Sequence, residues 1–305
     1  MAMNRRGFLK ATSRGVALLG FAPELVFAKD LNINHLIPSR PQDKHFLPKE
    51  GKDVINESAS SCQIYDERLK DYISKIKNFD QDHGSDIFLD DKSLKLLKSI
   101  LRRIKRINNT IGYANFNLVT LDHTFKIARN YRRIGSFHKA ELNFLEMIFH
   151  EEAYRYGFFG EKPLKKMTQQ INKREVIKVP QSGHYLYRGA PYKTYLEIKK
   201  VLGEGVILTS GVRNIMKQFL LFLNKANKHK GNLSLASRSL APPGYSFHGI
   251  GDFDVGKPSF GVANFTERFT TTDVYKKLQE LGYLELRYPD NNLLGVRFEP
   301  WHVKI

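Results

Sequence analysis

The stretch APPGYSFHGIGDFDVG, residues 241–256, combines a β-prone run with two side chains that bind metals well. Its GDFDV segment predicts a short strand bounded by glycines. His248 and Asp254 are six residues apart, which is an even spacing. If the segment runs as a strand, both side chains point to the same side of the sheet. The stretch therefore predicts a sheet that carries a polar site on one face.

A second group of polar side chains lies in RFEPWHVKI, residues 297–305. Glu299 and His302 flank Trp301, which is the only tryptophan of the chain. Glu299 and His302 could bind a metal or transfer a proton, or they could be ordinary polar groups of the surface. The choice depends on whether the rest of the chain supplies partners for them.

The candidate metal ligands are histidines and carboxylates, because the chain has a single cysteine, Cys62. One cysteine excludes both an intramolecular disulfide and a cysteine-based zinc site. A catalytic zinc site keeps three protein ligands and leaves one position for water. His248, Asp254 and His302 form such a set. Glu299 is then free to accept a proton from the water.

The pattern of residues 181–305 predicts an α+β domain with a small, mostly antiparallel sheet. The β-prone runs are YLYRG (185–189), GVILTSG (205–211), GDFDV (251–255), GYLELRY (282–288) and LLGVRFE (293–299). Helical patterns lie between them in PYKTYLEIKKVLG (191–203), RNIMKQFLLFLNKANK (213–228) and TTTDVYKKLQELG (270–282).

Three motifs in this segment resemble the zinc D-alanyl-D-alanine carboxypeptidases and dipeptidases (VanY-like), which are grouped with the lysostaphin-type peptidases and the hedgehog signalling domain. The first motif, SxHxxG…D, is matched by Ser246, His248, Gly251 and Asp254. The second, ExxH, is matched by EPWH, residues 299–302. The third, LTSGVRNIMKQ, is similar to the family's Ser-Gly-x-Arg segment with its following Gln, which places Arg213 and Gln218. The resemblance covers about residues 181–305.

The resemblance implies a role for each matched residue. The expected zinc ligands are His248, Asp254 and His302, and Glu299 is expected to act as base and then as acid. Arg213 is suited to a peptide's C-terminal carboxylate or to a developing oxyanion. The further substrate-binding residues are Ser246 and Gln218.

One departure from the family pattern concerns the carboxylate. The family usually has seven residues' separation from the His to the Asp, with a small residue two positions before the Asp. Here His248 and Asp254 are six apart, and Asp252 stands in the place of the small residue. A one-residue deletion in the loop restores the match with Asp254. Asp252 is the rival, either as a ligand or as a hydrogen-bonded support for a ligand imidazole.

The implied function is zinc-dependent removal of a terminal D-amino acid, D-Ala, from peptidoglycan stem peptides. The alternative is a catalytically weak or inactive protein that binds the cell wall or a partner and keeps the zinc fold. Glu299 favours the enzyme, because binding alone needs no base. The sequence leaves open D,D- versus L,D-specificity, carboxy- versus endopeptidase action and the oligomeric state.

Residues 61–180 are predicted to form a helical domain, whose role the motifs do not explain. Apolar residues recur at steps of three and four among basic ones, which predicts an amphipathic helix with a basic face: Leu94, Leu97, Leu101, Ile104 and Ile107. The stretch FHKAELNFLEMIFHEEAYRYGFFG, residues 137–160, predicts another helix that ends at its glycines. Its HEEAY is not the HExxH zinc motif, because Tyr154 occupies the place of the second histidine. His150 is therefore expected to be structural or exposed.

Residues 1–28 resemble a twin-arginine signal peptide. Arg5 and Arg6 precede the apolar run GVALLGFA, and small residues precede Lys29. The run is far shorter than the about 20 residues that span a membrane. We therefore expect periplasmic export with cleavage near Ala28. Residues 29–60, polar and punctuated by proline, are expected to form a linker or extended arm.

The composition indicates a globular protein with a strongly basic surface. Of the 305 residues, 41% are hydrophobic and 12% aromatic, which is enough for large apolar cores. The formal net charge of +18 favours contact with anionic membrane or wall surfaces. Export and the absence of a nucleic-acid-reading motif argue against a nucleic-acid partner.

Overall fold

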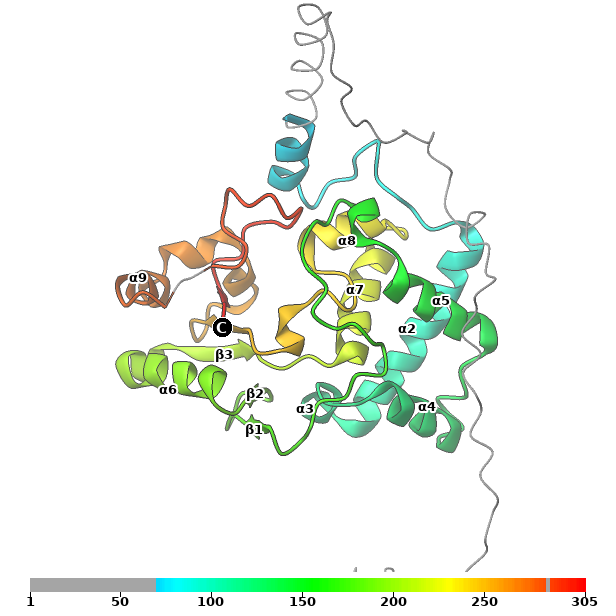
Figure 1. Cartoon of the computed structure of the whole chain (residues 1–305), viewed down its shortest axis with the longest axis horizontal. Coiled ribbons are helices and arrows are strands. Elements are labelled where there is room, and N and C mark those ends of the chain that lie inside the picture. Colours follow the sequence, from blue (N-terminus) through cyan, green and yellow to red (C-terminus); the bar gives the residue numbers. More distant parts are fainter. Residues whose placement is uncertain (1–69, 284–285) are drawn as a thin grey trace, which may run out of the picture. The chain divides into compact units, whose positions relative to one another are not determined.

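Along the described chain, helices come first and are followed by a region of helices and short strands, in the expected α+β pattern (Figure 1). A computed structural model describes residues 70–283 and 286–305. The predicted signal peptide, the predicted linker and Cys62 lie outside the described residues. The helices are α2 (Asp91–Ile111), α3 (Tyr113–Phe116), α4 (Leu121–Asn130), α5 (Lys139–His150), α6 (Ala190–Leu202), α7 (Ile215–Lys228), α8 (Leu233–Ser239) and α9 (Asp273–Glu280). The strands are β1 (Val176–Lys178), β2 (Tyr185–Tyr187), β3 (Ile207–Ser210), β4 (Phe253–Gly256) and β5 (His302–Val303).

Short 3₁₀ turns connect these elements. They are η2 (Ala153–Tyr156), η3 (Gly203–Gly205), η4 (Phe247–Gly249), η5 (Gly261–Phe265) and η6 (Glu267–Thr271). No helix in the described ranges combines the length and the apolar character needed to cross a membrane.

Helix α2 is the predicted amphipathic helix with a basic outer face. It begins after Asp90, whose carboxylate accepts a hydrogen bond from the Ser93 backbone N–H, and it ends before Gly112. Its apolar stripe is buried, whereas Lys95, Lys98 and other cations remain exposed. The three- and four-residue spacing therefore predicts both faces of this helix correctly.

The second predicted helix is shorter than its pattern indicates. Helix α5 ends at His150, because the Glu151 backbone turns extended, with φ −59° and ψ 139°. The following backbone N–H of Ala153 donates to the Tyr245 hydroxyl instead of continuing the helix. A separate 3₁₀ turn, η2, then runs to Gly157. His150 is exposed at the end of α5.

A large apolar core joins helices from both parts of the chain. It is built from α2, α4, α5, α7 and α8, with members that include Leu97, Ile104, Ile148, Phe219, Phe222 and Leu223. Helix α7 packs against α2, although α2 precedes residue 180 and α7 follows it (Figure 1). The predicted boundary between segments 61–180 and 181–305 remains a prediction. The packing nevertheless links the two segments through one buried cluster.

The three-stranded antiparallel sheet has the order β3-β4-β5. Its register pairs Asp254 of β4 with Ser210 of β3 and with His302 of β5. Successive side chains of a strand point to opposite faces. Phe253 and Val255 accordingly join a second apolar cluster that includes residues of α6 and α9. Asp254 points to the opposite face, in one row with its two polar neighbours.

Two predicted strands are absent from the described residues. Residues 293–299, and the described part of 282–288, form irregular segments. Their backbone groups pair with scattered partners, since the Arg297 N–H donates to the Arg238 carbonyl and the Glu299 N–H to that of Tyr288. Gly295 has φ +78°, and a Cβ there would lie 1.8 Å from the Gly157 carbonyl oxygen. The close packing of Gly295 against Gly157 therefore outweighs the β-prone composition of residues 293–299.

Candidate functional site

His248, Asp254 and His302 form a buried cluster that could hold a metal ion. Each is 2% exposed, and one ligand atom from each lies within 4.8 Å of the others. The Asp254 Oδ1 atom is 3.3 Å from His248 Nε2 and 3.2 Å from His302 Nδ1. This oxygen is buried, and no hydrogen bond reaches it. A cation bound by two imidazoles and one carboxylate would satisfy it, so the residues present fit a zinc ion.

The other nitrogen of each imidazole is already engaged. The Nδ1–H of His248 donates to the Gly211 carbonyl at 2.8 Å. The Nε2–H of His302 donates to Asp252 Oδ2, also at 2.8 Å. These contacts orient the two rings and leave Nε2 of His248 and Nδ1 of His302 directed at Asp254.

The electrostatics of the cluster differ between the two imidazoles. Burial and the nearby Arg213 charge lower the pKa of His248. Burial opposes protonation of His302 as well, but the hydrogen bond to Asp252 and the nearby negative charge of Asp254 raise its pKa to about 9. Burial likewise works against the Asp254 carboxylate, yet the charges of His248 and Arg213 hold its pKa well below the ordinary value. The carboxylate is thus ionised, as a ligand must be.

The backbone route to His248 differs from the predicted one. His248 lies in the 3₁₀ turn η4 and not on a strand, and β4 begins only at Phe253. The prediction that a continuous strand aligns His248 with Asp254 is therefore wrong. The turn brings the imidazole back over β4, and the Arg213 N–H fixes the His248 carbonyl at 3.1 Å.

Asp252 supports His302 from outside the cluster. Besides accepting from His302, its carboxylate forms a two-point ion pair with the Arg287 guanidinium. Burial would raise the pKa of Asp252, but His302 and Arg287 lower it far below the ordinary value. Arg287 also stacks over the Phe247 ring at 3.5 Å. This geometry favours Asp254 as the carboxylate ligand and Asp252 as the support.

Replacing Asp252 by Asn should weaken zinc affinity about 10–100-fold without abolishing binding, because the acceptor of His302 loses its charge. Competition against a fluorescent zinc chelator measures the effect. Asp290→Asn, at an exposed aspartate, is the matched control. An Asp252→Asn protein that binds zinc as tightly as the parent would contradict the supporting role.

Glu299 lies beside the cluster at the pocket wall. Its Oε2 is 3.8 Å from His302 Nδ1. A turn at Pro300 and Trp301, closed by a hydrogen bond from the His302 N–H to the Glu299 carbonyl at 3.2 Å, brings both side chains to the same place. Burial raises the pKa of the Glu299 carboxyl, although the charges of His302 and Arg297 oppose this. A carboxyl with a raised pKa accepts a proton more readily than an ordinary one.

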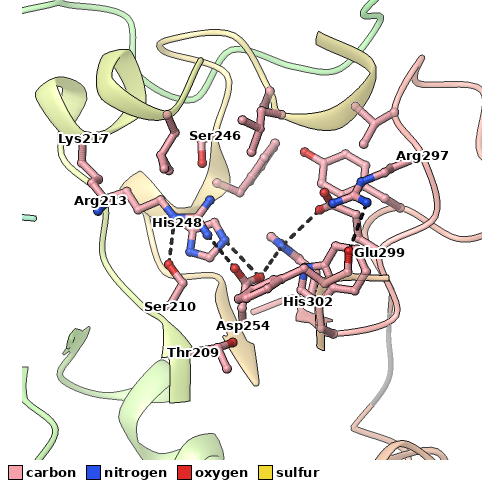
Figure 2. A pocket seen from close by; sticks show the side chains of 18 of the residues that line it. Thr209, Ser210, Arg213, Lys217, Ser246, His248, Asp254, Arg297, Glu299 and His302 are labelled. Carbon is pink, nitrogen blue, oxygen red and sulfur yellow. Dashed lines mark hydrogen bonds and ion pairs between the residues drawn. The ribbon is translucent and has the colours of Figure 1, made fainter. Parts of the chain in front are cut away.

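Arg213 is held by two partners within the site. Its guanidinium donates to Asp254 Oδ2 at 2.6 Å and to Ser210 Oγ at 2.8 Å. Figure 2 shows these residues beside His248. The side chain of Arg213 is 15% exposed. Arg213 therefore orients Asp254 through Oδ2, and the Oδ1 atom is left free for a metal.

The two predicted substrate-binding residues take different positions. Ser246 lines the same pocket as the cluster. Gln218 does not line it, since its amide donates to the Arg213 carbonyl at 3.0 Å and accepts from the Gly244 N–H at 2.8 Å. Gln218 thus links two backbone segments of the site, and its contact with substrate remains a prediction.

The pocket, with a volume of about 290 Å³, has further polar walls that the motifs did not indicate. They come from His184, Lys217, Tyr288 and Arg297. Tyr288 packs edge-on against the His302 ring at 5.5 Å. Burial and the Arg213 charge lower the pKa of His184 to about 4, so this imidazole is neutral. None of the four stands in a recognisable spacing, and only the fold brings them together.

The comparisons with known proteins agree with the motifs. Residues 192–305 match a family model described as D-alanyl-D-alanine carboxypeptidase, VanY. This confirms the expected resemblance over that segment, which contains all of the predicted site residues. His184 lies before it. No curated protein matches the chain.

Three solved structures are similar to part of the chain. The LdcB LD-carboxypeptidase has 26% identity and a TM-score of 0.34, over 42% of this chain and 62% of its own. A variant of the VanY D,D-pentapeptidase from a VanB-type vancomycin resistance cassette, in complex with Zn(II), has 25% identity and a TM-score of 0.35, over 43% and 77%. VanYB in complex with D-Alanine-D-Alanine has 21% identity and a TM-score of 0.37, over 48% and 83%. The chain thus spans less than two thirds of the first of these proteins.

Proposed function

We propose that the protein is a zinc-dependent carboxypeptidase that removes the terminal D-Ala from peptidoglycan stem peptides. One observation carries this proposal. The segment that matches the D-alanyl-D-alanine carboxypeptidase model contains a buried cluster of two histidines and an aspartate, with Glu299 beside it in a pocket. An inactive binding protein would have no need of a proton-transfer group at that position.

The zinc ligands in this proposal are Nε2 of His248, Oδ1 of Asp254 and Nδ1 of His302. A zinc ion held by them supplies Lewis acidity toward the peptide carbonyl and toward water. The protein's part is to keep these atoms in place. Arg213, which itself donates to Ser210, fixes the carboxylate, while Gly211 and Asp252 fix the imidazoles.

Glu299 moves the proton during hydrolysis. Its carboxylate takes a proton from the water whose oxygen attacks the scissile carbonyl carbon. As the carbon–nitrogen bond breaks, the Glu299 carboxyl gives this proton to the leaving amine of the terminal residue. Its raised pKa supports both steps, because the group must accept a proton and then release it.

Mass spectrometry of muropeptides incubated with the purified protein tests the proposed function. Pentapeptide stems should lose one D-Ala, and a chelator should stop the loss until zinc is added back. Intact pentapeptides, with zinc bound to the protein, would favour the alternative of a wall-binding protein that keeps the fold without turnover.

We further propose that the protein acts after export by the twin-arginine route. Changing both Arg5 and Arg6 to Lys should leave the precursor in the cytoplasm, because that route recognises the arginine pair. Cell fractionation with immunoblotting measures the distribution. Unchanged delivery to the periplasm would point to another export pathway.

A further inference from the structure

The pocket has two differently charged sides around the ligand cluster. Figure 2 shows Glu299 and Arg297 on the side of His302, and Arg213 and Lys217 on the side of His248. Glu299 places proton transfer on the first side. A peptide that lies across the cluster with its scissile bond near Glu299 directs one of its ends at the second side, where Arg213 and Lys217 lie.

Lys217 is a cation without a counter-charge. No described residue forms a hydrogen bond or an ion pair with its ammonium group. It stands in the first turn of α7, where the partial positive charge of the helix disfavours a cation. Burial and the Arg213 charge also lower its pKa, to about 8. A bound anion would relieve all three unfavourable effects.

Arg213 is less available than Lys217 to bind an anion. Its guanidinium already has Asp254 and Ser210 as partners. Lys217 carries three rotatable donors on a flexible stem, so it can follow a small anionic group. Consecutive Cα atoms of a peptide are about 3.8 Å apart, so the terminal carboxylate lies about one residue length from the scissile bond. The flexible stem of Lys217 can adjust to a group at that distance.

We propose that Lys217 binds the free C-terminal carboxylate of the substrate peptide and so makes the protein a carboxypeptidase and not an endopeptidase. This inference rests on the proposed function, and it adds the feature of the substrate that is selected. A peptide that continues beyond the scissile bond, or that ends in an amide, leaves Lys217 without its anion in a half-buried pocket. Charge-assisted hydrogen bonds of this kind correspond to an effect of about 10- to 100-fold.

The kinetic test compares diacetyl-L-Lys-D-Ala-D-Ala with its C-terminal amide. The parent should prefer the acid, and Lys217→Gln should lower kcat/KM for the acid about 10- to 100-fold, mainly through KM. The same change should leave the amide unaffected. Lys217→Arg should retain most of the preference, and Lys217→Met, which keeps the apolar stem, should behave like Lys217→Gln. Lys225→Gln is the matched control, because Lys225 is a partly buried lysine of the same helix outside the pocket.

A binding measurement separates this inference from the proposed function. Calorimetry measures the affinity of both peptides for the zinc-loaded Glu299→Gln protein, with and without Lys217→Gln. If the parent cleaves neither peptide but binds the acid in a Lys217-dependent way, the hydrolase proposal fails and the role of Lys217 stands. Equal use of acid and amide by the parent, or an unchanged preference in Lys217→Gln, overturns the role of Lys217 while hydrolysis stands. If the protein shows neither cleavage nor acid-selective binding, both the hydrolase proposal and the role of Lys217 are overturned.

Discussion

Replacing Glu299 by Gln is expected to lower kcat about 10²–10⁴-fold while the protein keeps its zinc. Gln has nearly the same size, and Glu299 is not one of the three clustered ligands. In the proposed mechanism, the substitution removes the group that takes a proton from water and returns it to the leaving amine. Zinc content and release of D-Ala from a muropeptide are measured on the same preparation.

The pH profile supplies an independent readout of the same group. Protonated Glu299 cannot accept a proton, so the activity of the parent should fall as the pH drops through the pKa of Glu299. Burial raises that pKa above the ordinary 4.5, which places this acid limb above 4.5. The residual activity of Glu299→Gln should not show this decrease at acidic pH. A variant that keeps zinc and cleaves at the parent rate would show that Glu299 is only a polar group of the pocket wall.

Replacing Asp254 by Asn is expected to abolish zinc binding. The Asp254 Oδ1 atom faces both imidazoles, and its Oδ2 atom pairs with Arg213. The substitution removes the charged ligand and also leaves the Arg213 guanidinium without its counter-charge. Breaking a buried ion pair typically costs about 3–5 kcal/mol of stability. Elemental analysis after dialysis gives the zinc content, and urea unfolding gives the loss in free energy.

The loss of zinc binding and the loss of the buried ion pair can be told apart by comparing the stabilities of metal-free proteins. If the metal-free parent is more stable than metal-free Asp254→Asn, the difference reports the lost charge interactions of Asp254 with Arg213 and the two imidazoles, without the metal. The Asp252→Asn protein should retain zinc under the same dialysis. Zinc kept by the Asp254 variant and lost by the Asp252 variant would reverse the assignment of ligand and support.

The sequence predicts those parts of the site that local chemistry determines. Pro300 cannot give an N–H to a β-ladder, and the chain accordingly turns between Glu299 and His302. The alternation of β4 likewise places Asp254 opposite Phe253 and Val255. Both features depend on a few neighbouring residues, and short-range rules therefore describe them well.

Features that depend on contacts distant in sequence were not predictable. His248 reaches the cluster because it lies in a 3₁₀ turn. Its imidazole is fixed by the carbonyl of Gly211, a residue 37 positions away. Arg287 pairs with Asp252 across 35 positions. Lys217 stands in a pattern that reads only as an amphipathic helix. In each case tertiary packing decides which polar groups meet, and no spacing in the chain records it.

The helical core shared across residue 180 limits how this protein can be recombined in evolution. Helix α7 has Lys217 at its N-terminal end, and its face with Phe219 and Phe222 packs in the core with helices encoded before residue 180. A gene fragment for residues 181–305 alone would yield a polypeptide whose largest helix exposes that apolar face to water and invites aggregation. The site is therefore inherited together with α2–α5. Exchange of the segment that carries the site between relatives requires partners whose helices match.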